Sequence, residues 1–85
     1  MIKIWARVYQ DDKTIDSCVY QSDEKYDPSE LYNYMREICY QLDLPTPLVL
    51  GKHIRSLGEF NTVKFKRDEF VEKVGFDFLL VENIA

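Results

Sequence analysis

The 85-residue sequence holds few of the residue types that build metal sites, thiol active sites and disulfide frameworks. His53 is its one histidine, and its two cysteines, Cys18 and Cys39, lie too far apart to form a CxxC pair. A metal site needs three or four converging ligands. We therefore expect no metal, no cofactor and no thiol catalysis, and we interpret both cysteines as reduced, small hydrophobic residues.

Long apolar runs, repeats and nucleotide-binding loops are also missing. No stretch approaches the ~18 consecutive apolar residues of a membrane helix, and the alternating start MIKIWARVY is unlike a signal peptide. The sequence has no glycine-rich phosphate loop, no RNP-like aromatic pattern and no helix-turn-helix signature. These absences favour a cytoplasmic protein without membrane contact, and they leave no motif that identifies a chemistry.

The sequence does hold enough apolar material for one globular unit. Hydrophobic residues make up 46% of the chain and charged residues 31%, a balance typical of folded domains. The length predicts a single domain over residues 1–85. The net charge of −4 favours solubility and weighs against attraction of the whole surface to nucleic acid or anionic membranes.

Two segments near the start alternate between apolar and polar side chains. Residues 2–10 and 14–21 therefore read as strands, and the polar link QDDK predicts that they form a β-hairpin. With the turn at Asp11 and Asp12, Val8 pairs with Ile15 and Trp5 pairs with Cys18. A shift by one residue would oppose Val8 to Asp16. The expected register gives one hairpin face that carries Trp5, Tyr9, Cys18 and Tyr20.

A long helix is predicted over residues 28–43. Asp27 is a typical N-cap, Pro28 suits the first helical position, and Glu30 completes a capping signature. Four apolar side chains recur at helical spacing and share one narrow arc, namely Leu31, Met35, Ile38 and Leu42. We expect this arc to pack on the hairpin face that carries Ile2, Ile4 and Val8, with Cys18 and Cys39 on opposite sides of the sheet.

The second half of the chain adds shorter elements. Residues 50–58 and 68–74 suit two short helices, and residues 61–66 alternate as a strand with Val63 and Phe65 inward. The run over residues 78–81 is apolar on both faces, which suits a central strand. The predicted fold class is α+β: a three- to four-stranded, mostly antiparallel sheet with an N-terminal β-hairpin, one long helix on one face and two short helices.

Aromatic residues mark two candidate contact surfaces, because Tyr, Trp and Arg are enriched in interface cores. Either the short helices cover the second face of the hairpin, or that face is a subunit interface. The outer side of the long helix is either a surface stack of Arg36 on tyrosine rings or a second contact. The candidate interaction residues are Trp5, Tyr9, Tyr20, Tyr32, Arg36 and Tyr40.

A basic segment, LGKHIRSLGEFNTVKFKR at residues 50–67, offers an alternative anion-binding site. We favour a plainer interpretation, a solvated helix face with an Arg55–Glu59 pair and an edge strand protected by lysines. The candidate anion-binding residues are Lys52, His53, Arg55, Lys64, Lys66 and Arg67.

We therefore predict a small, acidic, non-enzymatic cytosolic interaction module that self-associates, most simply as a homodimer, or binds a protein partner through aromatic surface positions. Nucleic-acid or phosphate-ligand binding through residues 52–67 is the alternative, and enzymatic activity ranks third.

Overall fold

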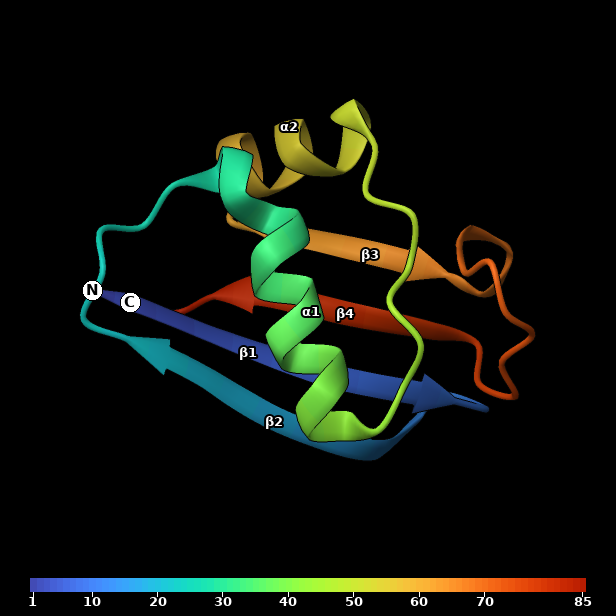
Figure 1. The fold of residues 1–85 in the computed structure, drawn as a ribbon. Helices are drawn as coiled ribbons and strands as arrows, with labels where there is room; N and C mark the ends of the chain where they lie inside the picture. Colours follow the sequence, from blue (N-terminus) through green and yellow to red (C-terminus); the bar gives the residue numbers. More distant parts are fainter.

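A computed structural model describes residues 1–85, and the chain in it forms one four-stranded antiparallel sheet with the strand order β2-β1-β4-β3 (Figure 1). The elements in chain order are β1 (Ile2–Gln10), β2 (Lys13–Ser22), a 3₁₀ turn (Pro28–Glu30), α1 (Leu31–Leu42), α2 (Gly51–Phe60), β3 (Thr62–Lys66), a second 3₁₀ turn (Arg67–Glu69) and β4 (Phe78–Asn83). The predicted α+β class, the N-terminal hairpin and the central position of the last strand are confirmed. β3, with its lysines, is an edge strand as expected.

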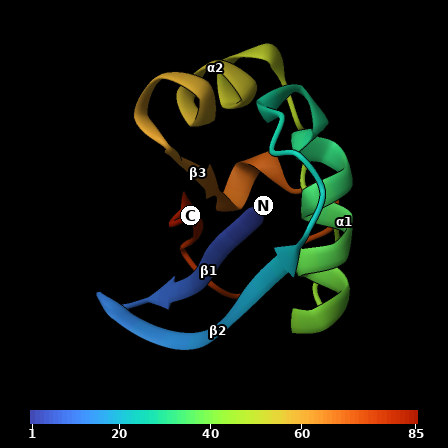
Figure 2. The same cartoon turned by 90° about the vertical axis from the view of Figure 1, so that its left-hand side faces the viewer.

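Both helices lie on one side of the sheet, and the opposite side carries no helix (Figure 2). The core lies between these two layers, since alternate residues of each strand point toward the helices. The strand residues of the core are Ile2, Ile4, Ala6, Val8, Val63, Phe65, Leu79 and Val81. Fully burying a large apolar side chain stabilises the fold by about 1.5–3 kcal/mol, so this single layer supplies most of the driving force.

Helix α1 buries the face that the sequence predicts. Leu31, Met35, Ile38 and Leu42 are all buried, and Tyr34 and Cys39 join them in the core. The helix is approached through the 3₁₀ turn, where the Asp27 carboxylate accepts a hydrogen bond from the Ser29 N–H at 3.0 Å. This bond caps the 3₁₀ turn, so the capping role of Asp27 is confirmed there. α1 itself begins at Leu31 without a side-chain cap, and the Asp27 N–H donates to the Tyr34 hydroxyl rather than to Glu30, so the predicted helix start at residue 28 and the capping role of Glu30 are wrong.

The register of the hairpin differs from the prediction over most of its length. Asp11 and Asp12 form a two-residue turn with positive φ angles of 53° and 64°, and the next pairs, Tyr9 with Thr14 and Gln10 with Lys13, follow the expected register. A β-bulge then shifts the pairing by one residue, so that Val8 pairs with Asp16.

The bulge moves two predicted surface residues to the helix side of the sheet. Cys18 now pairs with Ala6, and Tyr20 pairs with Ile4, so both side chains point toward the core rather than away from it. The ring of Tyr20 lies 5.9 Å from the ring of Tyr34 in α1. The prediction that Tyr20 and Cys18 share a face with Trp5 and Tyr9 is therefore wrong.

The two cysteines consequently lie on the same side of the sheet, and the prediction of opposite sides is also wrong. Both are free thiols; Cys39 is buried, and Cys18 is half-buried against the core. Burial, together with the neighbouring Cys18, raises the pKa of Cys39 to about 12. Cys39 is thus a neutral packing residue at physiological pH.

The predicted helix at residues 68–74 does not form. The chain makes only the 3₁₀ turn Arg67–Glu69, and Phe70 is then extended and forms an isolated bridge with Pro47. Phe70 and Phe76 are both buried and meet edge to face, with ring centroids 5.3 Å apart. The irregular backbone after the 3₁₀ turn lets both rings pack against the core, and their burial outweighs the local helical tendency.

Replacing Ile38 with alanine should lower the free energy of unfolding by about 2–5 kcal/mol, because it removes a fully buried side chain from the contact between α1 and the sheet. Gln41→Ala, on the exposed side of the same helix, is the matched control and should change it by less than about 0.5 kcal/mol. Urea denaturation followed by far-UV circular dichroism would measure both values. Equal losses for the two variants would contradict this packing of α1.

Candidate interaction surface

The side of the sheet that carries no helix is the candidate interaction surface, and we call it the open face (Figure 2). Paired residues of neighbouring strands point to the same face, so the strand register identifies its members. From β2 across to β3 they are Thr14, Ser17, Val19 and Gln21, then Lys3, Trp5, Arg7 and Tyr9, then Phe78, Leu80 and Glu82, then Thr62, Lys64 and Lys66.

Arg7 organises the centre of the open face. Its guanidinium lies over the Trp5 ring, 3.8 Å from the centroid, and its Nη2 donates a hydrogen bond to Glu82 Oε1 at 2.8 Å. Nη1 also donates to the Tyr9 hydroxyl at 3.3 Å. The Arg7 side chain is only 18% exposed, so these contacts are stronger than those of a fully solvated pair. They hold the Trp5 ring against the sheet.

A second group of rings lies beside Arg7. Tyr9 and Phe78 stack across β1 and β4 with centroids 4.8 Å apart and an interplanar angle of 19°. Lys64 of β3 places its Nζ 4.4 Å from the Phe78 centroid. Rings fixed by such neighbours lose little conformational freedom when a partner covers them, which favours binding.

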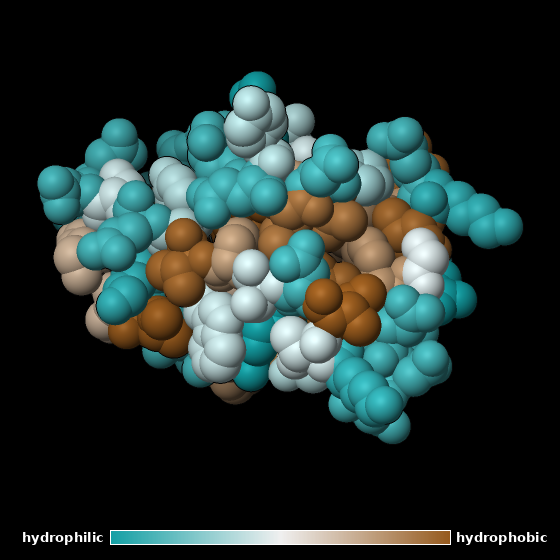
Figure 3. Space-filling model, turned by 90° about the horizontal axis from the view of Figure 1, so that it is seen from below, coloured by the Kyte–Doolittle hydropathy of each residue, from teal (hydrophilic) through white to brown (hydrophobic).

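Apolar and charged groups are distributed unevenly on and around the open face. Figure 3, seen from the side on which β2 forms the sheet edge, shows hydrophobic atoms between hydrophilic side chains. In this strand Ile15 and Val19 are 54% and 44% exposed. The basic side chains of the open face, by contrast, lie on β1, which carries Lys3 and Arg7, and on β3, which carries Lys64 and Lys66.

Trp5 and Tyr9 are the predicted interaction residues that the open face contains, and Tyr20 is excluded from it. The other predicted group lies on the outer side of α1, where Tyr32 and Tyr40 are 52% and 86% exposed and Arg36 is exposed too. The cation–π contacts of the protein involve Arg7 and Lys64 rather than Arg36. We call Tyr32, Arg36 and Tyr40 the helix stripe; it is a separate exposed surface.

Several members of the open face escaped the sequence reasoning, among them Arg7, Ser17, Val19, Phe78, Leu80 and Glu82. The apolar run at residues 78–81 signals a central strand, but a run of this kind normally indicates cover on both faces. The half-buried Phe78 and Leu80 instead contribute to a face that the chain leaves without a second layer.

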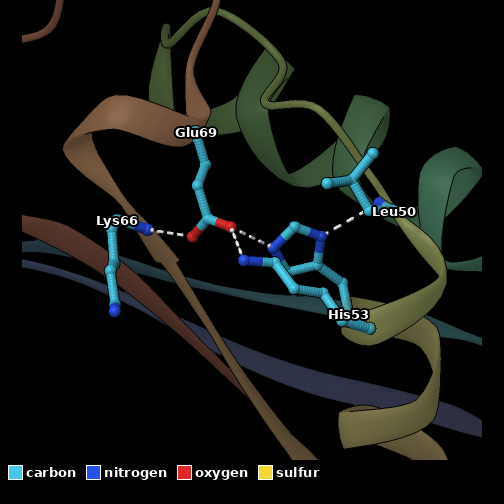
Figure 4. Close-up of polar contacts among 5 residues, drawn as sticks. Leu50, His53, Lys66 and Glu69 are labelled. Carbon is cyan, nitrogen blue, oxygen red and sulfur yellow. Dashed lines mark hydrogen bonds and ion pairs between the residues drawn. The ribbon is translucent and has the colours of Figure 1, made fainter.

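The basic segment contains a polar network centred on Glu69 (Figure 4). Its carboxylate accepts hydrogen bonds from the Lys66 N–H at 2.9 Å and from His53 Nε2 at 2.7 Å, and it pairs with Lys52 Nζ at 2.9 Å. His53 Nδ1 accepts from the Leu50 N–H at 2.9 Å, which places the imidazole proton on Nε2. His53 is therefore a neutral side chain that links the start of α2 to the turn after β3.

The histidine and the carboxylate of this network are largely withdrawn from solvent. His53 is 3% exposed, and its ring lies 4.5 Å from that of Phe65. Burial by itself would raise the pKa of Glu69, but the hydrogen bonds from Lys66, Lys52 and His53 outweigh it and lower that pKa to about 2. Glu69, which the sequence reasoning missed, is thus ionised whenever the protein is near neutral pH.

The basic residues converge only in part. Lys52, Lys64 and Lys66 line one hollow together with His53 and Glu69. Arg67 turns away and pairs with Asp77 at 2.7 Å, while Arg55 is exposed on α2 and does not line this hollow. The structure contains no group of three or more His, Cys, Asp or Glu residues that could hold a metal ion. Neither helix is long and apolar enough to cross a membrane.

Glu69→Gln should lower the free energy of unfolding at pH 7 by about 1–3 kcal/mol, because it removes the charge that three donors share. Because the pKa of Glu69 falls from its ordinary value of 4.5 to about 2 on folding, its ionisation stabilises the fold above about pH 4.5. That contribution is lost as pH falls toward 2. The stability gap between wild type and variant should therefore narrow from pH 5 to pH 2.5 in denaturant titrations.

The control for this experiment is Glu59→Gln, which removes a carboxylate that is exposed and makes no ion pair. It should change the free energy of unfolding by less than about 0.5 kcal/mol at pH 7. A Glu69 gap that stayed constant across the titration would show that the charge of Glu69 does not contribute to folding.

Comparisons of the chain with protein-family models, with curated proteins and with solved structures found no match.

Proposed function

We propose that the protein is a small, non-enzymatic interaction module that self-associates through the open face. The observation that carries the proposal is the absence of a second layer over the face that carries Trp5, Tyr9 and Phe78 (Figure 2). The sequence left two alternatives for this face, cover by the short helices or contact with another subunit. α2 packs on the same side as α1, since His53 meets the core residue Phe65.

The chemistry of the open face suits protein contact. Its centre is formed by Trp5, Tyr9, Phe78 and Leu80, all half-buried within the single chain. Tyr, Trp and Arg anchor many interfaces because each combines a large contact area with a polar group. The one charged pair in this centre, Arg7 with Glu82, is neutral as a unit, so covering it leaves no unpaired charge.

The proposed setting is the cytoplasm. Both thiols are free and the pKa of each is raised by burial, which suits a compartment in which cysteines stay reduced and unreactive.

Sedimentation equilibrium at tens of micromolar should give a species of about 20 kDa, twice the 10.1 kDa of one chain. Trp5 is the only tryptophan, so its fluorescence reports on the open face directly. Acrylamide quenching of Trp5 should become weaker as the protein concentration rises through the dimerisation range, because association covers the ring. A 10 kDa species whose quenching does not change with concentration would contradict self-association through this face.

Binding of nucleic acid or a phosphate ligand is the second candidate function, and the shared hollow of Lys52, Lys64 and Lys66 is the observation that favours it. The ionised Glu69 in the same hollow weakens it, because the carboxylate already pairs with Lys52. The net charge of −4 also opposes the approach of a polyanion.

We predict no micromolar binding of mixed single- and double-stranded DNA or RNA at physiological salt in gel-shift experiments. Binding through phosphate contacts releases counterions, so a true complex would weaken steeply as salt rises. Salt-sensitive micromolar binding that is lost in Lys64→Glu/Lys66→Glu but kept in Lys13→Glu/Lys73→Glu would overturn this ranking. Lys13 and Lys73 are exposed lysines outside the hollow and serve as the charge-matched control.

A further inference from the structure

We infer that the open face of one copy docks on the outer side of α1 of a second copy, so that the open face and the helix stripe form the two halves of one contact. This inference rests on the proposed function and adds the surface that covers the open face. It follows from the charges that the two surfaces carry and from the partners that those charges lack within one chain.

The open face is basic although the chain is acidic. Its charged side chains give it a net charge of +3, and they are Lys3, Arg7, Lys64, Lys66 and Glu82. The whole chain has a net charge of −4, so the remaining residues together carry −7. Arg7 pairs with Glu82, but none of the three lysines has a carboxylate partner. A surface with exposed carboxylates therefore complements the open face.

The outer side of α1 carries the opposite charge. The exposed charged side chains of the helix and the residues that flank it are Glu30, Arg36, Glu37 and Asp43, a net charge of −2. None of these four side chains forms an ion pair within the chain. Tyr32 and Tyr40 expose large apolar rings beside them. The outer side of α1 therefore offers both the carboxylates and the aromatic area that would cover the open face.

The other helix lacks this chemistry. The exposed charged side chains of α2 are Lys52, Arg55 and Glu59, a net charge of +1. A basic helix does not attract a basic sheet face, so α1 is the element of the helix layer that suits the open face.

Charge selects this contact from the three ways in which two copies can combine these surfaces. Open face against open face brings the unpaired lysines of both copies together, and α1 against α1 brings their carboxylates together. Open face against α1 places the lysines of one copy near the carboxylates of the other. Arg36, the one base on the outer side of α1, then approaches a face whose aromatic rings suit a guanidinium.

The lengths of the two surfaces also agree. α1 has 12 residues, which corresponds to about 18 Å at 1.5 Å per residue. β4, in the middle of the sheet, has 6 residues, which corresponds to about 20 Å. One helix therefore spans the ring-bearing centre of the open face.

This contact has a consequence for the size of the assembly. The open face and α1 lie on opposite sides of the molecule (Figure 2), so the contact is heterologous and leaves one copy's open face and the other copy's α1 unoccupied. The average mass should pass through twice the 10.1 kDa of one chain at tens of micromolar and continue to rise at higher concentration. A dimer that pairs two identical surfaces would stop at that mass.

Mixing two variants tests the contact directly. Leu80→Asp disrupts the centre of the open face, and Tyr32→Ala/Tyr40→Ala removes the rings from α1. Each variant alone should be a monomer at tens of micromolar. An equimolar mixture retains one intact open face and one intact α1, so it should form a heterodimer of twice the 10.1 kDa that does not grow further.

Controls separate the contact from misfolding. Circular dichroism of each variant would establish that it is folded. Because Leu80 is half-buried, the exposed pair Lys64→Glu/Lys66→Glu is the second open-face variant and should weaken self-association of the protein in the same way. Phe60→Ala removes an exposed ring from α2 instead of α1 and should leave self-association within about twofold of wild type.

A single charge reversal tests the electrostatic part. Glu37→Lys should raise the dissociation constant about 2- to 10-fold, because it replaces attraction to the open-face lysines with repulsion. Glu72→Lys makes the same change at an exposed position outside both surfaces and should stay within about twofold of wild type. Equal effects of the two reversals would overturn the inference.

The mixing outcomes distinguish this inference from the proposed function. If Tyr32→Ala/Tyr40→Ala dimerises alone and Leu80→Asp does not, open faces pair with each other; the inference is overturned and the proposed function stands. A mixture of two folded monomeric variants that stays monomeric also overturns the inference. If Leu80→Asp still associates alone, the open face is not the contact, and both are overturned. A wild-type monomer overturns both, whether or not it binds a single-stranded oligonucleotide.

Discussion

One additional residue in β2 determines which side chains the sheet buries and which it presents. Ile15 has no partner in β1, and from this bulge onward every side chain of β2 points to the face opposite the one that the turn alone would assign. Tyr20 and Cys18 consequently lie under α1, while Ser17 and Val19 lie on the open face. β1 pairs with both β2 and β4, and its inward residues Ile2, Ile4 and Ala6 have no exposed surface.

The carboxylate of Glu69 is the second feature on which the fold depends. It joins α2, the end of β3 and the turn that follows, through His53, Lys52 and the Lys66 backbone. A buried histidine and a cluster of lysines are features that suggest a binding site when they are read from sequence. Here the Glu69 carboxylate pairs with Lys52 and accepts a hydrogen bond from His53, and the network closes the end of the fold where α2 meets β3.

The bulge in β2 and the Glu69 network lie outside the centre of the open face, where Trp5, Tyr9 and Phe78 form a group of half-buried aromatic rings. Aromatic rings at its centre are held by Arg7 and Lys64, and its charged side chains are mostly basic, since Lys3, Arg7, Lys64 and Lys66 outnumber Glu82. A surface of this kind discriminates partners by orientation, because electrostatic complementarity sets register more than it sets affinity. The small size of the chain explains why the open face has no second layer, since one layer of helices can cover only one side of the sheet.

The sequence by itself determined the local elements. Alternation in residues 2–10, the Asp27 cap and the arc of Leu31, Met35, Ile38 and Leu42 are periodic or short-range signals, and each appears in the structure as predicted. The exposure of the helix stripe follows from the same periodicity, as does the inward direction of Val63 and Phe65. Such features depend on neighbours within a few positions, so they can be read without knowledge of the fold.

Only the tertiary structure decided the features that depend on residues far apart in the chain. The bulge forms because the turn and the core impose different registers on β2, and the segment at residues 67–76 follows the core rather than its helical tendency. Glu69 contacts His53 although β3 lies between them in the chain. Both helices pack on the side of the sheet to which the apolar residues of the strands point. Burial and hydrogen bonding between distant segments outweigh local preference at these places, and together they produce the open face.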